Sequence, residues 1–228
     1  MKTTEVHQPQ KGSRPAWFFY AAPFVLFLLL TEPGRFFPLY TPYFYIAKTI
    51  FVGALLWFWR HHYVQDFFSK LSLPQTLISV ACGILVLVIW IVPEGYFFQL
   101  EQKHIFNPHG LGESQAAYLL LLGVRLLGAT LVVPVMEELF WRSFLMRYLI
   151  EPDFCKVPMG SFAWLSFVGV AVLFGLEHNR IVVGIVAGVL YGLLLIWQKN
   201  LKTVILAHAV TNLGLGVYVI LTGSWWFW

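Results

Sequence analysis

Residues 73–92 form a long apolar run that contains no charged side chain. A helix needs about 20 apolar residues to cross the hydrocarbon core of a bilayer, and this run is long enough. It therefore predicts a membrane-spanning helix, and any fold proposed for the chain has to accommodate it.

Similar apolar runs recur along the rest of the chain. They cover residues 17–31, 43–59, 115–133, 134–150, 161–176, 181–197 and 203–221. The first run is expected to be a retained helix, with a signal peptide as the alternative, because no A-x-A-like cleavage site follows it. Pro134 interrupts the backbone ladder, so it is expected to kink or restart the helix that begins near residue 115. The sequence thus predicts an all-α fold, a polytopic membrane helical bundle of seven to eight transmembrane helices.

The composition supports this class of protein. Only 11% of the residues are charged and 59% are hydrophobic, whereas a soluble domain carries roughly a quarter charged residues. We expect residues 1–16 to be a polar N-terminal tail and residues 17–228 to be a single transmembrane helical domain in contact with the lipid bilayer. The core of that domain, which carries the motifs described below, spans about residues 115–221.

The formal net charge of +4 does not indicate a nucleic-acid partner, because no basic run is dense enough. Positive charge in cytoplasmic loops explains it more simply, since such loops are enriched in Lys and Arg. The tail and the second loop carry more basic residues than the first and third loops. The tail has Lys2, Lys11 and Arg14, the second loop Arg60 and Lys70, the first Arg35 and the third Lys103. This bias predicts a cytoplasmic N-terminus and a location in the plasma (inner) membrane.

The two cysteines, Cys82 and Cys155, form neither a CxxC pair nor a zinc-binding spacing. The sequence therefore gives no indication of a disulfide framework or of a thiolate metal site. We expect no cofactor and no metal.

Charged residues in the segment 134–148 are the main anomaly. Glu137, Glu138 and Arg142 lie in a run that is otherwise apolar, and ionisable groups at membrane depth are usually functional and paired. Glu138 and Arg142 have the i,i+4 spacing of an ion pair on a helix. Glu137 points about 100° away from Glu138. Glu137 is therefore the candidate reactive group, and the other two are its supporting structure.

Two further apolar segments carry polar side chains at helical spacing. Phe174 and His178 are one i,i+4 pair, and His208 and Asn212 are another. A carboxylate shielded from bulk water can act as a general base, and His and Asn side chains can donate hydrogen bonds to an oxyanion. These groups suffice to activate water against a carbonyl without a serine or cysteine nucleophile.

The ordered set EExxxR, FxxxH and HxxxN resembles the CAAX protease and bacteriocin-processing family, also called the Abi family. This family includes the type II CAAX prenyl endopeptidases, which are intramembrane glutamic proteases. The resemblance covers about half of the chain. In overall size and in its N-terminal helices, the chain also resembles the bacterial CAAX-protease-related branch that accompanies exosortase systems.

The resemblance implies a role for each motif. Glu137 would activate water together with His178, and His208 and Asn212 would form the oxyanion hole. Glu138 and Arg142 would order the site. The substrate would be a peptide or protein with a scissile peptide bond near the membrane, in some members beside a prenylated cysteine.

Several alternatives remain at this stage. The cluster around Glu137 is also consistent with a structural ion pair, a metalloprotease site, a proton relay in a transport-type protein, or a non-catalytic membrane scaffold that has kept the motifs. Arg125 has no motif and is expected to be a structural partner or a snorkelling side chain. Glu177 is expected to lie in a loop at the membrane surface. Gly184, Gly188 and Gly192 form a small-residue stripe that favours close helix packing.

Overall fold

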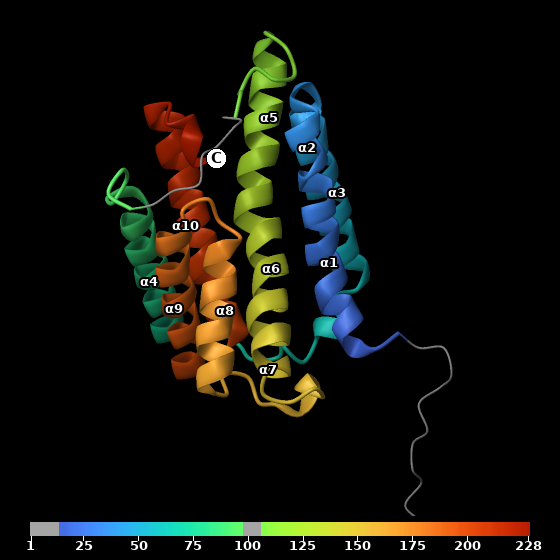
Figure 1. The fold of residues 1–228 in the computed structure, drawn as a ribbon, viewed down its shortest axis with the longest axis vertical. Helices are drawn as coiled ribbons and strands as arrows, with labels where there is room; N and C mark the ends of the chain where they lie inside the picture. Colours follow the sequence, from blue (N-terminus) through green and yellow to red (C-terminus); the bar gives the residue numbers. More distant parts are fainter. Residues whose placement is uncertain (1–13, 98–105) are drawn as a thin grey trace, which may run out of the picture.

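The computed structural model describes residues 14–97 and 106–228, and every regular element within them is helical (Figure 1). The polar tail predicted for residues 1–16 lies almost wholly outside the described residues. Lys2, Lys11 and Lys103, which contributed to the loop charge count, also lie outside them.

Ten α-helices are present in the described part of the chain. They are α1 (Ala16–Thr31), α2 (Pro33–Phe36), α3 (Thr41–Phe58), α4 (Leu73–Ile91), α5 (Gln115–Leu127), α6 (Val133–Glu138), α7 (Met146–Tyr148), α8 (Trp164–Leu176), α9 (Ile181–Gln198) and α10 (Leu201–Thr222).

Five helical stretches in the described residues are long and apolar enough to cross a membrane. They are Pro38–Phe58, Leu73–Ile91, Gln115–Tyr148, Ile181–Gln198 and Leu201–Thr222. Helices α1 and α8 are apolar but shorter. The structure thus confirms an all-helical chain with five such helices, and it does not confirm the predicted seven or eight.

Helices α5, α6 and α7 are parts of one continuous helix, Gln115–Tyr148. Pro134 therefore does not end one helix and start another, which was one of the two outcomes expected from the sequence. Two π-helical segments, Gly128–Val132 and Leu139–Leu145, join the three parts. In the first segment the N–H of Val133 donates to the carbonyl of Gly128, five residues earlier. Pro134 has no N–H to give, and the wider π turn absorbs the missing bond without breaking the helix.

This long helix runs through the middle of the molecule (Figure 1). The α1 and α3 pair packs on one side of it, and α4, α8, α9 and α10 lie together on the other side. Side chains of the long helix therefore face both groups of helices, and the turn between α8 and α9 lies partway along the bundle (Figure 1).

The glycine stripe of α9 packs against α8. A Cβ placed on Gly184 would lie 2.9 Å from the Cα of Gly175, and one on Gly188 would lie 3.0 Å from the Cα of Ala171. Only a residue without a side chain allows backbones to approach this closely. The predicted close packing is confirmed, and it draws the end of α8, which carries the FxxxH motif, onto α9.

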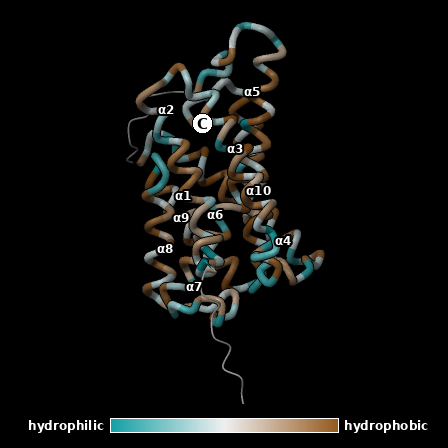
Figure 2. Tube along the Cα trace, turned by 90° about the vertical axis from the view of Figure 1, so that its right-hand side faces the viewer, coloured by the Kyte–Doolittle hydropathy of each residue, from teal (hydrophilic) through white to brown (hydrophobic). Residues whose placement is uncertain are grey.

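The outside of the bundle is apolar along the helices, and hydrophilic residues gather toward their ends (Figure 2). Large hydrophobic side chains such as Leu29 and Leu165 are 63% and 76% exposed. A soluble protein rarely exposes apolar surface so extensively. The chain is an integral membrane protein.

Candidate active site

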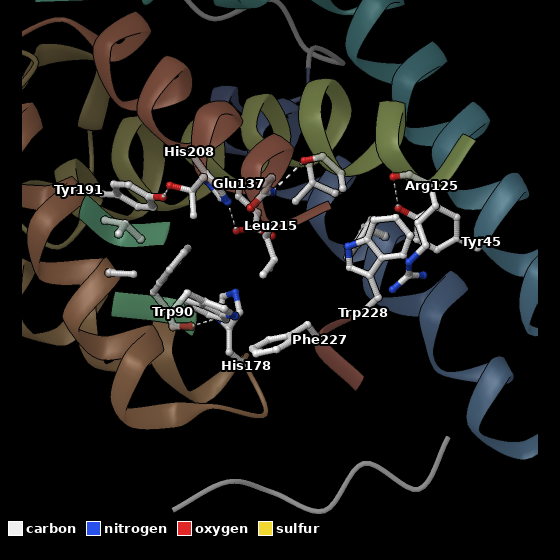
Figure 3. Close-up of a pocket in the computed structure, with 18 of the residues that line it drawn as sticks. Tyr45, Trp90, Arg125, Glu137, His178, Tyr191, His208, Leu215, Phe227 and Trp228 are labelled. Atoms are coloured by element: carbon white, nitrogen blue, oxygen red, sulfur yellow. Dashed lines mark hydrogen bonds and ion pairs between the residues drawn. The ribbon is translucent and has the colours of Figure 1, made fainter. Parts of the chain in front are cut away.

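A partly open cavity of about 260 Å³ lies between the long helix and the helices on both sides of it (Figure 3). Among the residues that line it are four from three separate segments: Glu137, His178, His208 and Asn212. These are the four candidate catalytic residues of the sequence analysis. The remaining lining is mostly aromatic and aliphatic.

Glu137 of α6 points into this cavity and is 4% exposed. Its Oε2 atom accepts no hydrogen bond from the described residues. The nearest ion-pairing group is His208, whose Nε2 lies 4.0 Å from that oxygen. Glu137 is therefore a buried carboxylate with a free oxygen in the cavity, which is the arrangement a general base needs.

Glu138, the next residue, does not line the cavity and instead accepts hydrogen bonds from two other side chains. Its Oε1 accepts a hydrogen bond from Nη1 of Arg142 at 3.2 Å and another from Nδ1 of His208 at 2.8 Å. The Glu138 and Arg142 side chains are almost fully buried. The predicted Glu138–Arg142 pair is present, and the same carboxylate also orients the histidine of the third motif.

Arg142 is held further by the aromatic face of Phe174, which lies 4.3 Å from its guanidinium carbon. A cation over an aromatic ring is attracted to the negative face of that ring. Phe174 of the FxxxH motif thus contacts the arginine of the EExxxR motif, which links the first two motifs.

His178 lies in the turn after α8, and its Nδ1 is 2.7 Å from the carbonyl oxygen of Phe174. A carbonyl only accepts hydrogen bonds, so Nδ1 carries the proton in this contact. The i,i+4 spacing of FxxxH places the ring over that carbonyl. In the neutral ring Nε2 then keeps its lone pair, which can accept a proton.

Asn212 of α10 donates a hydrogen bond from Nδ2 to the carbonyl of Ala129 at 2.8 Å. This carbonyl lies in the first π segment, where Val133 donates to Gly128 instead and Pro134 has no N–H. Asn212 therefore satisfies a backbone acceptor that the π turn leaves open. The second amide hydrogen of Asn212 remains for a ligand in the cavity.

The ring of His208 stacks on Tyr191 of α9, with centroids 5.2 Å apart. The Tyr191 hydroxyl donates to Oγ1 of Thr211 at 2.8 Å, and Thr211 donates to the carbonyl of Gly83 in α4. Three helices thus fix the orientation of His208. Tyr191 and Thr211 line the cavity but belong to no motif, and spacing alone gave no signal for them.

Glu177, beside His178, is not a simple surface residue. It is only partly exposed, and its Oε2 accepts a hydrogen bond from Nε1 of Trp141 on the long helix at 3.2 Å. This contact fastens the turn between α8 and α9 to the helix that carries Glu137.

Lys48 of α3 and Arg125 of α5 also line the cavity. Lys48 was missed in the sequence, although a lysine inside an apolar run is itself a signal of function. No group of three or more His, Cys, Asp or Glu side chains within residues 14–97 and 106–228 is arranged to hold a metal ion.

Part of the chain matches a known protein family. Residues 119–214 match the family model described as type II CAAX prenyl endopeptidase Rce1-like. The matched stretch contains all four candidate catalytic residues, together with Glu138 and Arg142. No curated protein and no solved structure matches the chain.

Proposed function

This chain carries a domain of the Rce1-like type II CAAX prenyl endopeptidases, a protease family, and on that premise we propose that it is an intramembrane glutamic endopeptidase. Its substrate is a peptide bond of a membrane-associated or prenylated protein. The observation that carries the proposal is that Glu137, His178, His208 and Asn212 line one cavity.

Glu137 and His178 activate the water in this proposal. A water between them gives a proton to the carboxylate, and its oxygen attacks the carbonyl carbon of the scissile bond. The protonated group then delivers that proton to the leaving nitrogen as the C–N bond breaks. His178 suits this role because its Nδ1–H is engaged by the Phe174 carbonyl, which leaves Nε2 toward the reaction.

Asn212 and His208 stabilise the oxyanion. Asn212 has one amide hydrogen to spare beyond its bond to Ala129. His208 already donates through Nδ1 to Glu138, so Nε2 donates only when the ring carries both protons. The Glu138 carboxylate, bonded to Nδ1, is the countercharge of that ring.

The N-terminal end of the bundle is the cytoplasmic end in this proposal, and the membrane is the plasma (inner) membrane. Helix α1 starts at this end, and the α3–α4, α7–α8 and α9–α10 connections lie there too (Figure 1). They carry Arg14, Arg60, Lys70, Lys156, Lys199 and Lys202. Cytoplasmic loops are enriched in such residues. With α1 and α8 also embedded in the membrane, the bundle has seven transmembrane helices.

The test is cleavage of internally quenched prenylated peptides by the purified full chain in lipid nanodiscs. Glu137→Gln keeps the size of the side chain but removes its basicity, so it should abolish cleavage. Thermal unfolding of the variant checks that it is folded. Cleavage by a folded Glu137→Gln protein at the wild-type rate would exclude the mechanism.

A metalloprotease is the competing enzyme. Water activation by Glu137 and His178 needs no metal, so activity should persist after treatment with a strong chelator. Loss of activity with the chelator, and its return on adding zinc, would favour the metal mechanism.

A proton relay or a non-catalytic scaffold is the alternative outside enzymes. It draws on the same cavity, since Glu137 of the long helix and Lys48 of α3 are buried ionisable groups that both line it. Comparing the C-terminal peptides of cells that express wild type or Glu137→Gln separates the two. Only a protease changes the protein termini that are found.

A further inference from the structure

Two cations in the cavity play no part in the contacts described above. Lys48 and Arg125, together with Tyr45 and Trp228, line both the catalytic cavity and a second cavity of about 680 Å³ beside it. Figure 3 shows Arg125 and Trp228 on one side of the pocket, away from Tyr191 and His208. The cations therefore lie at the junction of the two spaces.

Lys48 is 8% exposed, and its ammonium group makes one hydrogen bond, to Oγ1 of Thr31 at 3.0 Å. The rings of Phe27 and Tyr45 lie 4.1 and 4.8 Å from the nitrogen. An ammonium group has three hydrogens to donate. Two of them have no acceptor among the described residues.

The guanidinium of Arg125 donates no hydrogen bond to any described residue. Its Nε is buried and unpartnered. Aromatic rings surround it instead, with centroids 4.5 Å away for Phe106, 4.6 Å for Tyr45 and 5.2 Å for Trp228. These rings attract the cation but leave its donors unfilled.

Neither cation forms an ion pair with a carboxylate in the described part of the chain. Both contact the same ring, that of Tyr45, so their charges lie no farther apart than the sum of the two ring distances. Like charges repel strongly where little water screens them. A buried charge without a partner is costly, and such a pair is expected to bind an anion.

We propose that Lys48 and Arg125 form an anion subsite for the free C-terminal carboxylate of the peptide substrate. The inference rests on the proposed function and names two side chains that would bind one end of the substrate. A planar carboxylate matches the fork of donors on an arginine. Because the subsite lines the same small cavity as Glu137, a carboxylate bound there would lie close to the candidate catalytic residues.

The test is binding to the full chain with the Glu137→Gln substitution, which blocks cleavage, in nanodiscs of zwitterionic lipid. The probes are two prenylated peptides of one sequence, one ending in a carboxylate and the other in a carboxamide. A charge-assisted contact predicts about 10- to 100-fold tighter binding of the carboxylate form. Equal affinities, or no binding of either peptide, would overturn the subsite.

Adding Lys48→Met should bring the two affinities to within about twofold, whereas the matched control Lys70→Met, an exposed lysine outside both cavities, should keep the preference. Lys48→Met removes an unneutralised buried charge, so the melting temperature should not fall. A lower melting temperature with an unchanged preference would show that Lys48 is structural and overturn the proposal. Arg125→Lys should keep part of the preference and Arg125→Gln none.

A lipid phosphate is the other source of an anion. If nanodiscs containing phosphatidylglycerol stabilise wild type but not Lys48→Met, and neither peptide is preferred, the subsite belongs to lipid and the assignment to a peptide terminus is wrong. Wild-type cleavage is scored separately. A preference for the carboxylate without cleavage would reject the proposed protease and leave the subsite standing.

Discussion

The Glu138 carboxylate accepts a hydrogen bond from Nδ1 of His208 at 2.8 Å, from a residue 70 positions later in the chain. The same oxygen accepts from Arg142. The second glutamate of the EExxxR motif therefore does more than neutralise its arginine. It holds Nδ1 of His208 as a donor and keeps Nε2 facing Glu137.

Glu138→Ala should lower both activity and stability. Arg142 would be left as a buried charge without its carboxylate, which costs about 3–5 kcal/mol in comparable cases. Thermal unfolding in detergent measures the stability, and an unchanged melting temperature would contradict the role given to the ion pair.

Glu138→Gln separates orientation from charge. The amide oxygen can still accept from His208 Nδ1 and from Arg142, so the loss of stability should be smaller than in Glu138→Ala. The His208 cation loses a countercharge, and kcat should fall more than KM changes. Equal changes in both constants would mean that Glu138 acts on substrate binding instead.

His178→Ala should reduce kcat by about 10²- to 10⁴-fold, the usual contribution of a general acid–base group. Its ring makes one hydrogen bond, to the backbone of its own segment, so the melting temperature should change little. His61→Ala, at an exposed histidine that does not line the catalytic cavity, is the control and should retain full activity. Retained activity in His178→Ala would move the base function to Glu137 alone.

The parts of the site that the sequence predicted are those that depend on local spacing. The Glu138–Arg142 pair and the placing of His178 over the Phe174 carbonyl both follow from one turn of helix. The structure also gathers Glu137, His178, His208 and Asn212 in one cavity, while their catalytic roles remain predictions.

The parts that the sequence did not predict depend on how separate helices pack. Lys48 and Arg125 are far apart in the chain and meet only at the ring of Tyr45. The bond between His208 and Glu138 likewise joins two helices, and no spacing rule reports it. The predicted number of transmembrane helices was seven or eight because a proline in a helix predicts an interruption. The π turn before Pro134, which keeps the helix continuous, has no signal in the sequence pattern.

Asn212→Ala should lower kcat by about 10²- to 10³-fold if its amide is an oxyanion donor. It should also destabilise the protein by about 1–3 kcal/mol, because the Ala129 carbonyl loses its partner. Pro134→Ala restores a backbone N–H five residues after Ala129, within reach of that carbonyl in a π turn. The stability loss from Asn212→Ala should therefore be smaller in the Pro134→Ala protein, and the loss of kcat should be the same. Additive stability changes in this double-mutant cycle would rule out the shared acceptor.

Gly188→Ala should destabilise the bundle and reduce activity together. The added methyl group would meet the Ala171 backbone of α8, 3.0 Å from both its Cα and its carbonyl oxygen, and backbone cannot give way as a side chain can. Helix α8 would be pushed off α9, and His178 at its end would move away from Glu137. Gly123→Ala is the matched control on the long helix, because a Cβ there meets nothing within 4 Å. That change should be neutral or stabilise the helix by up to about 1 kcal/mol. Thermal unfolding and peptide cleavage of both variants provide the comparison, and equal behaviour of the two glycines would show that close packing of α8 on α9 does not position the site.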